Sequence, residues 1–188
     1  MKKIHPPAKR LTFKRYQRGA TILEYIIYSV LALGVLAGIA VFATTANNKS
    51  NATGLAKGAA GSQIATRNFY QNGSFGTGSL NAELIAASNI IPGDWNISGS
   101  TITGQGDTDI VFTGMGLTYS ISIAKLNQDT CQILVASSSN AQWASVTVSG
   151  SAAGTAITKW PITQAVAAKT TACGAPATNG LTVVFTSK

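Results

Sequence analysis

The residues that could perform chemistry in this chain are few and far apart. The sequence holds one histidine, His5, two cysteines and six carboxylates. His5 lies in a basic N-terminal segment, and without that segment no imidazole would remain for general base catalysis or for metal ligation. Asp107 and Asp109 supply two carboxylates, but the rest of a calcium-binding loop is missing. We therefore expect the chain not to be an enzyme and to bind neither a metal nor a cofactor.

The positive charge of the chain is concentrated at one end. There are 14 lysines and arginines against 6 aspartates and glutamates, which gives a net charge of +8. Seven of the 14 cations precede Ala20 and no carboxylate does, so seven cations face six carboxylates in the remainder, a net charge of +1. Outside the first 19 residues the chain lacks the basic surface that nucleic acid requires. No nucleic-acid partner is therefore predicted.

An uncharged segment follows the basic one. Residues 25–48 contain no charged side chain, and residues 25–43 alone would form a helix of about 28 Å. That length is close to the bilayer core of about 30 Å, and the positive flank predicts that the N-terminus stays in the cytoplasm. The segment is longer than the apolar core of a cleaved secretory signal, roughly 7–15 residues. A single-pass membrane anchor is one simple interpretation.

Glu24 does not fit a plain anchor. A carboxylate costs about 2.5–3.5 kcal/mol at the centre of a membrane helix and less near the interface. Since Glu24 lies at the start of the apolar span, it either reaches the lipid headgroups or has a cationic partner. The residues around it favour a cationic partner.

Residues 18–25 read Arg-Gly-Ala-Thr-Ile-Leu-Glu-Tyr and resemble the processing site of type IV prepilins. In that family a basic leader ends in glycine, the fifth residue after the glycine is glutamate, and an apolar helix follows. A membrane peptidase cuts after the glycine on the cytoplasmic side and methylates the new amine. The resemblance therefore implies a leader of residues 1–19, cleavage after Gly19, and a mature chain that begins at Ala20 with Glu24 as its fifth residue.

The long leader and the large remainder resemble the type IVb group of this family, and within it the thin-pilus pilins of conjugative plasmids. Alanine at the first mature position departs from the more familiar Phe, Met or Leu. It is closer to the small Flp-type pilins, which are far shorter than this chain. The resemblance implies that the ammonium group of Ala20 pairs with Glu24 of a neighbouring copy, which would offset the cost of a carboxylate in an apolar medium.

The resemblance also implies partners and a location. The partners are further copies of the chain, prepilin peptidase, an inner-membrane assembly platform and an assembly ATPase. The precursor would reside in the bacterial inner membrane, and the processed chain would belong to an extracellular pilus.

The apolar helix is predicted to continue from Ala20 to Tyr70, because no proline interrupts the chain in that interval. We assign residues 20–48 to a transmembrane and polymerisation half of this helix. Residues 49–70 are assigned to a half that packs against the head.

Two pairs of glycines are spaced four residues apart in the predicted helix. Gly34 with Gly38, and Gly54 with Gly58, would permit close contact between helices. The resemblance implies that Gly34 and Gly38 let the helix stretch or melt locally on assembly. Family members often carry a proline nearby, and this chain has none there.

Residues 71–188 are predicted to form a globular α+β head. Helical patterns cover residues 80–88, 127–138 and 161–170, the last with Pro161 at an early position. Residues 109–113 and 117–124 are predicted to form a hairpin, 144–149 and 181–186 two further strands, and 71–79 a turn-rich loop. This order favours an antiparallel sheet packed on the distal half of the first helix. The predicted fold class is α+β and type IV pilin-like, with Trp95, Trp143 and Trp160 in the core or in an interface.

The two cysteines are expected to form a disulfide if the head lies in the periplasm, which is oxidising. Cys131 and Cys173 enclose 41 residues, and closing a loop of that size contributes about 4 kcal/mol to stability. Two unrelated buried thiols are the alternative. By the resemblance, residues 131–173 form a variable region exposed on the filament surface.

The function that the resemblance implies is that of the major structural subunit of a type IVb pilus, used for conjugative or adhesive cell contact. One alternative is a minor pilin or a pseudopilin of a secretion system. Another is a membrane-anchored binding domain that never polymerises, which predicts an uncut N-terminus and tolerance of Glu24→Ala.

Overall fold

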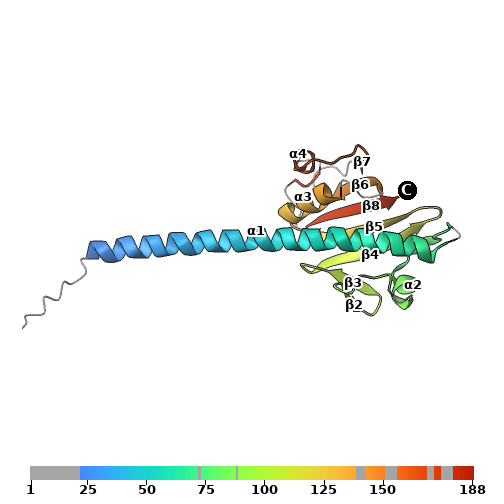
Figure 1. The fold of residues 1–188 in the computed structure, drawn as a ribbon, viewed down its shortest axis with the longest axis horizontal. Coiled ribbons are helices and arrows are strands. Elements are labelled where there is room, and N and C mark those ends of the chain that lie inside the picture. The colour runs from blue at the N-terminus through green and yellow to red at the C-terminus, as the bar shows by residue number, and fades with distance from the viewer. Residues whose placement is uncertain are drawn as a thin grey trace, which may run out of the picture. The chain divides into compact units, whose positions relative to one another are not determined.

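The computed structural model describes residues 22–71, 73–87, 89–138, 143–150, 156–168, 172–174 and 180–188. These residues contain four helices and eight strands (Figure 1). In chain order the elements are α1 (Ile22–Phe69), β1 (Thr77–Ser79), α2 (Asn81–Ala86), β2 (Asn96–Ser98), β3 (Thr101–Gly104), β4 (Thr108–Met115), β5 (Tyr119–Leu126), α3 (Gln128–Ser137), β6 (Trp143–Ser149), β7 (Ala156–Ile157), α4 (Gln164–Ala167) and β8 (Leu181–Ser187).

The chain divides into two compact units, Met1–Val41 and Phe42–Lys188, and α1 contributes residues to both. In the first unit all described side chains are exposed. In the second unit α1 has a buried face that includes Ala52, Leu55 and Ala59. Within the described residues, α1 is the one helix long and apolar enough to cross a membrane, judged by its length and composition.

The second unit is built on an antiparallel sheet. Its strand order is β2-β3-β4-β5-β8-β6-β7, and β1 also pairs with β4. The final strand, β8, therefore lies between β5 and β6, with Phe185 opposite Ile121 on one side and Val146 on the other. The sheet is complete only when the end of the chain has joined it, so its central pairings are long-range in sequence.

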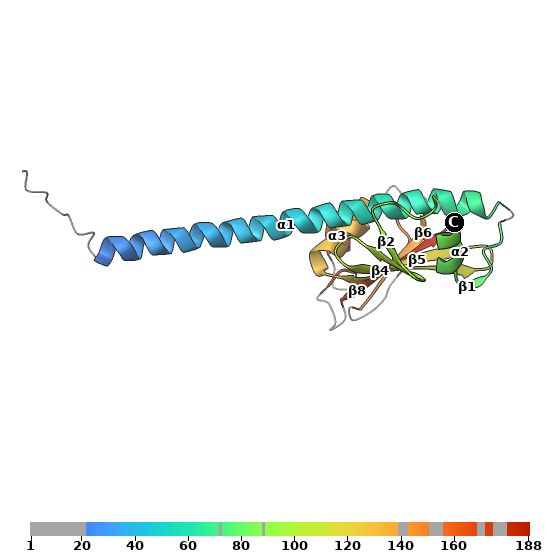
Figure 2. The same cartoon turned by 90° about the horizontal axis from the view of Figure 1, so that it is seen from below.

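Alternating side chains of the central strands form the core. Along β8, Leu181, Val183 and Phe185 are buried and the residues between them are half-buried. Figure 2 shows the part of α1 that belongs to the second unit lying along the sheet. The core joins its buried face to the sheet residues and to Trp95 and Trp143. Burial of Trp95 and Trp143 confirms the prediction for these two residues, whereas Trp160 is half-buried.

The side chain of Asn81 hydrogen-bonds to backbone groups of β4 at a point where no neighbouring strand pairs with them. Its Oδ1 accepts a hydrogen bond from the N–H of Phe112 at 2.8 Å, and its Nδ2 donates to the carbonyl of Ile110 at 3.1 Å. β3 pairs with β4 up to Ile110, and β1 pairs from Thr113 onward. The buried side-chain amide of Asn81 thus supplies the hydrogen bonds that a strand would otherwise make to β4 between its pairings with β3 and β1.

Most of the predicted elements are confirmed, with three differences. The segment predicted as a loop, 71–79, contains β1, and the strands β2, β3 and β7 were not predicted at all. The helix predicted from Pro161 is wrong at its start: Thr163 caps it by accepting from the N–H of Val166, so α4 begins at Gln164. The predicted helix start at Ala20 lies outside the described residues.

Candidate assembly surfaces and the disulfide

The part of α1 in residues 22–42 carries a continuous apolar surface. The large apolar side chains that the structure describes there are between 49 and 82% exposed, with Ile27 the least and Ile22 the most exposed. Glu24 is also exposed and stands in the first turn of α1, where a carboxylate interacts favourably with the helix dipole. Gly19 and Ala20, the predicted cleavage site, lie outside the described residues. An apolar surface of this extent requires a bilayer or another protein surface to cover it.

The two glycine pairs of α1 occupy different surroundings. A Cβ at Gly58 would lie 2.5 Å from Cζ2 of Trp95, and one at Gly54 would overlap Oε1 of Gln105. The pair Gly54 and Gly58 therefore serves packing inside the second unit. A Cβ at Gly34 or at Gly38 would meet no atom within 4 Å, so this pair remains open to a partner. Helix α1 runs through both positions without a break.

A polar cluster ties α1 to the start of α3. Nδ2 of Asn48 donates to Oδ2 of Asp129 at 3.4 Å, and Nδ2 of Asn127 donates to Oδ1 of Asn48 at 3.1 Å. Asn127 also caps α3, because its Oδ1 accepts from the N–H of Thr130 at 2.8 Å. One asparagine side chain thus fixes both the start of α3 and its contact with α1.

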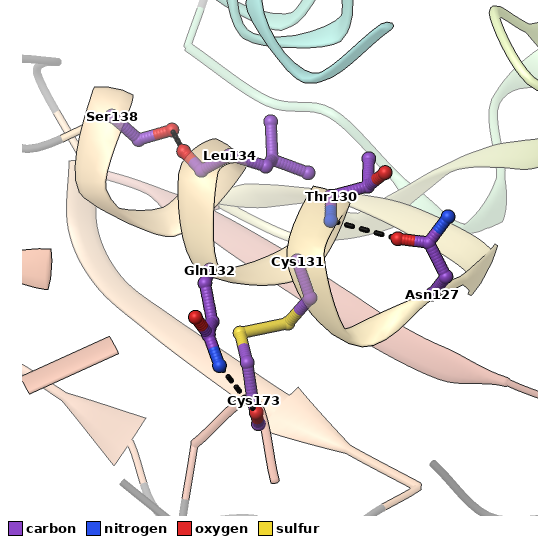
Figure 3. The surroundings of a disulfide bond; sticks show 7 residues. All are labelled: Asn127, Thr130, Cys131, Gln132, Leu134, Ser138 and Cys173. Carbon is purple, nitrogen blue, oxygen red and sulfur yellow. Dashed lines mark hydrogen bonds between the residues drawn. A yellow bond between two sulfur atoms is a disulfide. The ribbon is translucent and has the colours of Figure 1, made fainter. Parts of the chain in front are cut away.

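Cys131 and Cys173 form a disulfide, as predicted, and both are fully buried (Figure 3). Cys131 lies in the first turn of α3, and Cys173 follows the short helix α4. Nε2 of Gln132 donates to the carbonyl of Cys173 at 3.3 Å, which adds a second link between the two segments. The disulfide therefore attaches the chain around Cys173 to the capped helix α3, at its buried face. Residues 139–142, 151–155 and 169–171 of the predicted variable region lie outside the described residues.

Hydrogen bonds also fix the end of α1. The hydroxyl of Tyr70 donates to Glu83, and the hydroxyl of Tyr119 donates to the carbonyl of Gln63 at 2.9 Å. Burial, the hydrogen bond to Glu83 and the charge of that carboxylate raise the pKa of Tyr70 to about 12. Burial also raises the pKa of Tyr119, against the opposing effect of the Arg67 charge. Both phenols are therefore neutral donors at physiological pH.

Two adjoining hollows lie between α1 and other residues of the second unit, with volumes of about 390 and 610 Å³. Residues of α1 between 46 and 65 form one side, and residues 89–94 with Gln105 form the other. We call this surface the α1 groove. Ile90, Ile91 and Pro92 make part of its wall apolar. Sequence reasoning missed it, although the spacing of Gly54, Gly58 and Gly61 hinted at a helix face without bulky side chains.

Titratable side chains do not gather into a metal site in the described part of the chain. No group of three or more histidines, cysteines, aspartates or glutamates there could hold an ion. The salt bridge found among these residues joins Lys125 Nζ to Asp109 Oδ2 at 3.1 Å and is exposed. It therefore links two strands rather than marking a reactive centre.

The fold is that of a type IV pilin: a long apolar N-terminal helix followed by an antiparallel sheet. It is similar to the crystal structure of the type IVb pilin from Salmonella typhi, with a TM-score of 0.52 and 16% identity over 72% of this chain and 96% of that chain. It also matches TcpA, a type IV pilin from Vibrio cholerae El Tor biotype, with a TM-score of 0.48 and 17% identity over 74% of this chain and 99% of that chain. No protein-family model and no curated protein sequence matches the chain. The structure thus confirms the predicted fold class.

Proposed function

We propose that this chain is a structural subunit of a type IV pilus that polymerises through residues 20–48. The observation that carries the proposal is the exposed apolar surface of α1 on a chain with the pilin fold. Each large apolar side chain left in water costs about 1.5–3 kcal/mol relative to burial. The bilayer would cover this surface in the precursor, and neighbouring copies would cover it in the filament. The chain performs no catalysis in this proposal.

Processing and pairing follow from the sequence. In our proposal prepilin peptidase removes residues 1–19 after Gly19, and the ammonium group of Ala20 pairs with Glu24 of a neighbouring copy. This pairing would favour one axial offset between neighbouring copies, because placing a carboxylate among apolar helices without a cationic partner costs free energy. The assembly platform and the ATPase supply the work of extraction from the inner membrane.

The experiment compares filaments sheared from cells that produce the wild type, Glu24→Ala or Glu24→Asp. The proposal expects abundant wild-type filaments, a loss with Glu24→Ala, and partial retention with Glu24→Asp, which keeps the charge. All three proteins should be equally abundant in whole cells. Equal filament yields for the wild type and Glu24→Ala would contradict the pairing, and absence of the wild-type chain from sheared filaments would contradict the polymer.

We further propose that the chain is the major subunit and that the pilus serves conjugative or adhesive cell contact. Resemblance to the thin-pilus pilins supports this choice over a minor pilin or a pseudopilin. The subunit count in sheared filaments tests the first part, because a minor subunit would be outnumbered by another pilin. Mating and adhesion assays on a deletion strain, with and without complementation, test the second part. Unchanged mating and unchanged adhesion would contradict it.

A further inference from the structure

We propose that the α1 groove is the docking site for residues 24–34 of a second copy, with α1 of the two copies parallel and offset by 30 residues. The proposal rests on the proposed function and specifies which surface of the head each apolar helix meets. Three observations carry it: a matching pattern of large and small residues, complementary charge, and open space at Gly34 and Gly61.

The two surfaces have the same spacing with large and small residues exchanged. On the apolar segment Glu24, Leu31 and Gly34 stand at intervals of seven and three residues. On the other copy, Gly54 and Gly61, which line the groove, and the exposed Ile64 beside it stand at the same intervals. At 3.6 residues per turn, each set occupies one side of its helix. An offset of 30 residues places Glu24 at Gly54, Leu31 at Gly61 and Gly34 at Ile64.

The side chains that must interlock are available in the free chain. Leu31 is 60% and Ile64 is 58% exposed. A Cβ at Gly61 or at Gly34 would meet no atom within 4 Å. Leu31 can therefore enter the space above Gly61, and Ile64 the space above Gly34, as close helix packing requires. The apolar wall at residues 90–92 continues this contact.

The charges of the groove and the segment are complementary. The groove is lined by Lys49 and Lys57 and by the single carboxylate Asp94, a net charge of +1. Asp94 already accepts a hydrogen bond from Gln105 at 2.9 Å. Glu24 is the only charged residue of the docking segment. At the proposed offset it faces Gly54, which the Gln105 side chain covers and which lies between the two lysines in the sequence. Docking therefore brings the net charge to zero.

This contact is compatible with pairing between Glu24 and an ammonium group. A carboxylate has two oxygens and about four acceptor positions. One oxygen can accept from the Ala20 amine of one neighbour while the other faces the lysines of another. Glu24 would then fix the axial offsets to two different neighbouring copies rather than to one.

Cysteine cross-linking in sheared filaments tests the register. Leu31→Cys with Gly61→Cys in one chain should give a ladder of linked subunits after oxidation, because the two positions face each other. Leu33→Cys with Gly61→Cys is the matched control, since Leu33 is also exposed but lies on the opposite side of the helix. Val35→Cys with Gly61→Cys samples a register shifted by one turn. A ladder from Leu31 alone supports the proposal; a ladder from Leu33 or Val35, or none, overturns it.

Each cysteine pair is assembled together with wild-type subunits, so that a weakened variant still enters filaments. Failure of the wild type to form filaments would refute the proposed function. Wild-type filaments without the Leu31 ladder would refute the docking alone.

Charge reversal gives a second readout. Lys57→Glu should reduce filament yield, Lys57→Arg should retain it, and Lys159→Glu should leave it unchanged because that exposed lysine lies outside the groove. Equal yields for Lys57→Glu and Lys159→Glu would contradict a role for the groove lysines. A loss with Lys57→Arg as large as with Lys57→Glu would also contradict it.

Discussion

Removal of the disulfide should destabilise the second unit strongly. The bond joins residues separated by 42 positions, and constraining a loop of that size in the unfolded chain contributes about 4 kcal/mol. For a unit of this size each kcal/mol shifts the melting temperature by about 2–4 °C. The double variant Cys131→Ala/Cys173→Ala should therefore melt about 8–16 °C below the wild type. Since both cysteines are fully buried, loss of the sulfur contacts adds to the effect.

The assay is thermal unfolding of the full chain in detergent, followed by tryptophan fluorescence. All three tryptophans lie in the second unit, so the signal reports on that unit and not on the apolar helix. Wild-type protein treated with a reductant is the control, and it should melt close to the double variant. A shift below about 2 °C, equivalent to less than about 1 kcal/mol, would show that the disulfide does not stabilise the head.

Three further predictions concern the packing of the head. Gly58→Ala should lower the free energy of unfolding by about 1–3 kcal/mol, because its Cβ would overlap the indole ring of Trp95. Gly61→Ala should raise the free energy of unfolding by about 1 kcal/mol, because its Cβ would meet no other atom. Equal effects of the two substitutions in urea unfolding would contradict this prediction. Asn81→Ala should lower the free energy of unfolding by about 1–3 kcal/mol, because two buried backbone groups of β4 lose their hydrogen-bond partner. A decrease below about 0.5 kcal/mol in urea unfolding would contradict this role of Asn81. Stability should also fall as the pH rises from 10 towards about 12, because unfolded tyrosine loses its proton near 10 while folded Tyr70 keeps it up to about 12. Tyr70→Phe should reduce this decline, and an unchanged decline in unfolding curves across that pH range would contradict the assignment.

The elements that the sequence reveals are those with a long periodic pattern. The apolar run from residue 25, the alternation in residues 117–124 and the pattern in 127–138 each specify an element on their own, and α1, β5 and α3 are found there. The strands that were missed are two to four residues long, and all three residues of β1 and of β2 are exposed. No apolar alternation marks β1 and β2, because their backbones pair with β4 and β3 without burying side chains.

Long-range arrangement is the part that local sequence does not contain. The position of β8 between β5 and β6 depends on side chains from three distant segments. The hydrogen bond between Asn48 and Asn127 joins residues 79 positions apart. The sequence around either residue does not predict this contact. The candidate assembly residues are different, since Glu24 and its distance from Gly19 are visible in the sequence alone. The α1 groove needed the structure, because residues 89–94 form its second wall.

Intact-mass spectrometry of filaments sheared from the native cells tests whether the chain is a processed pilus subunit. A processed subunit should give a dominant species that begins at Ala20 and is two hydrogens lighter than the reduced chain because of the disulfide. A methyl group on the Ala20 amine would appear as a separate increment in the same spectrum. If the sheared fraction lacks this species and the membrane fraction holds the full chain from Met1, the chain does not polymerise. It would then be a membrane-anchored binding domain.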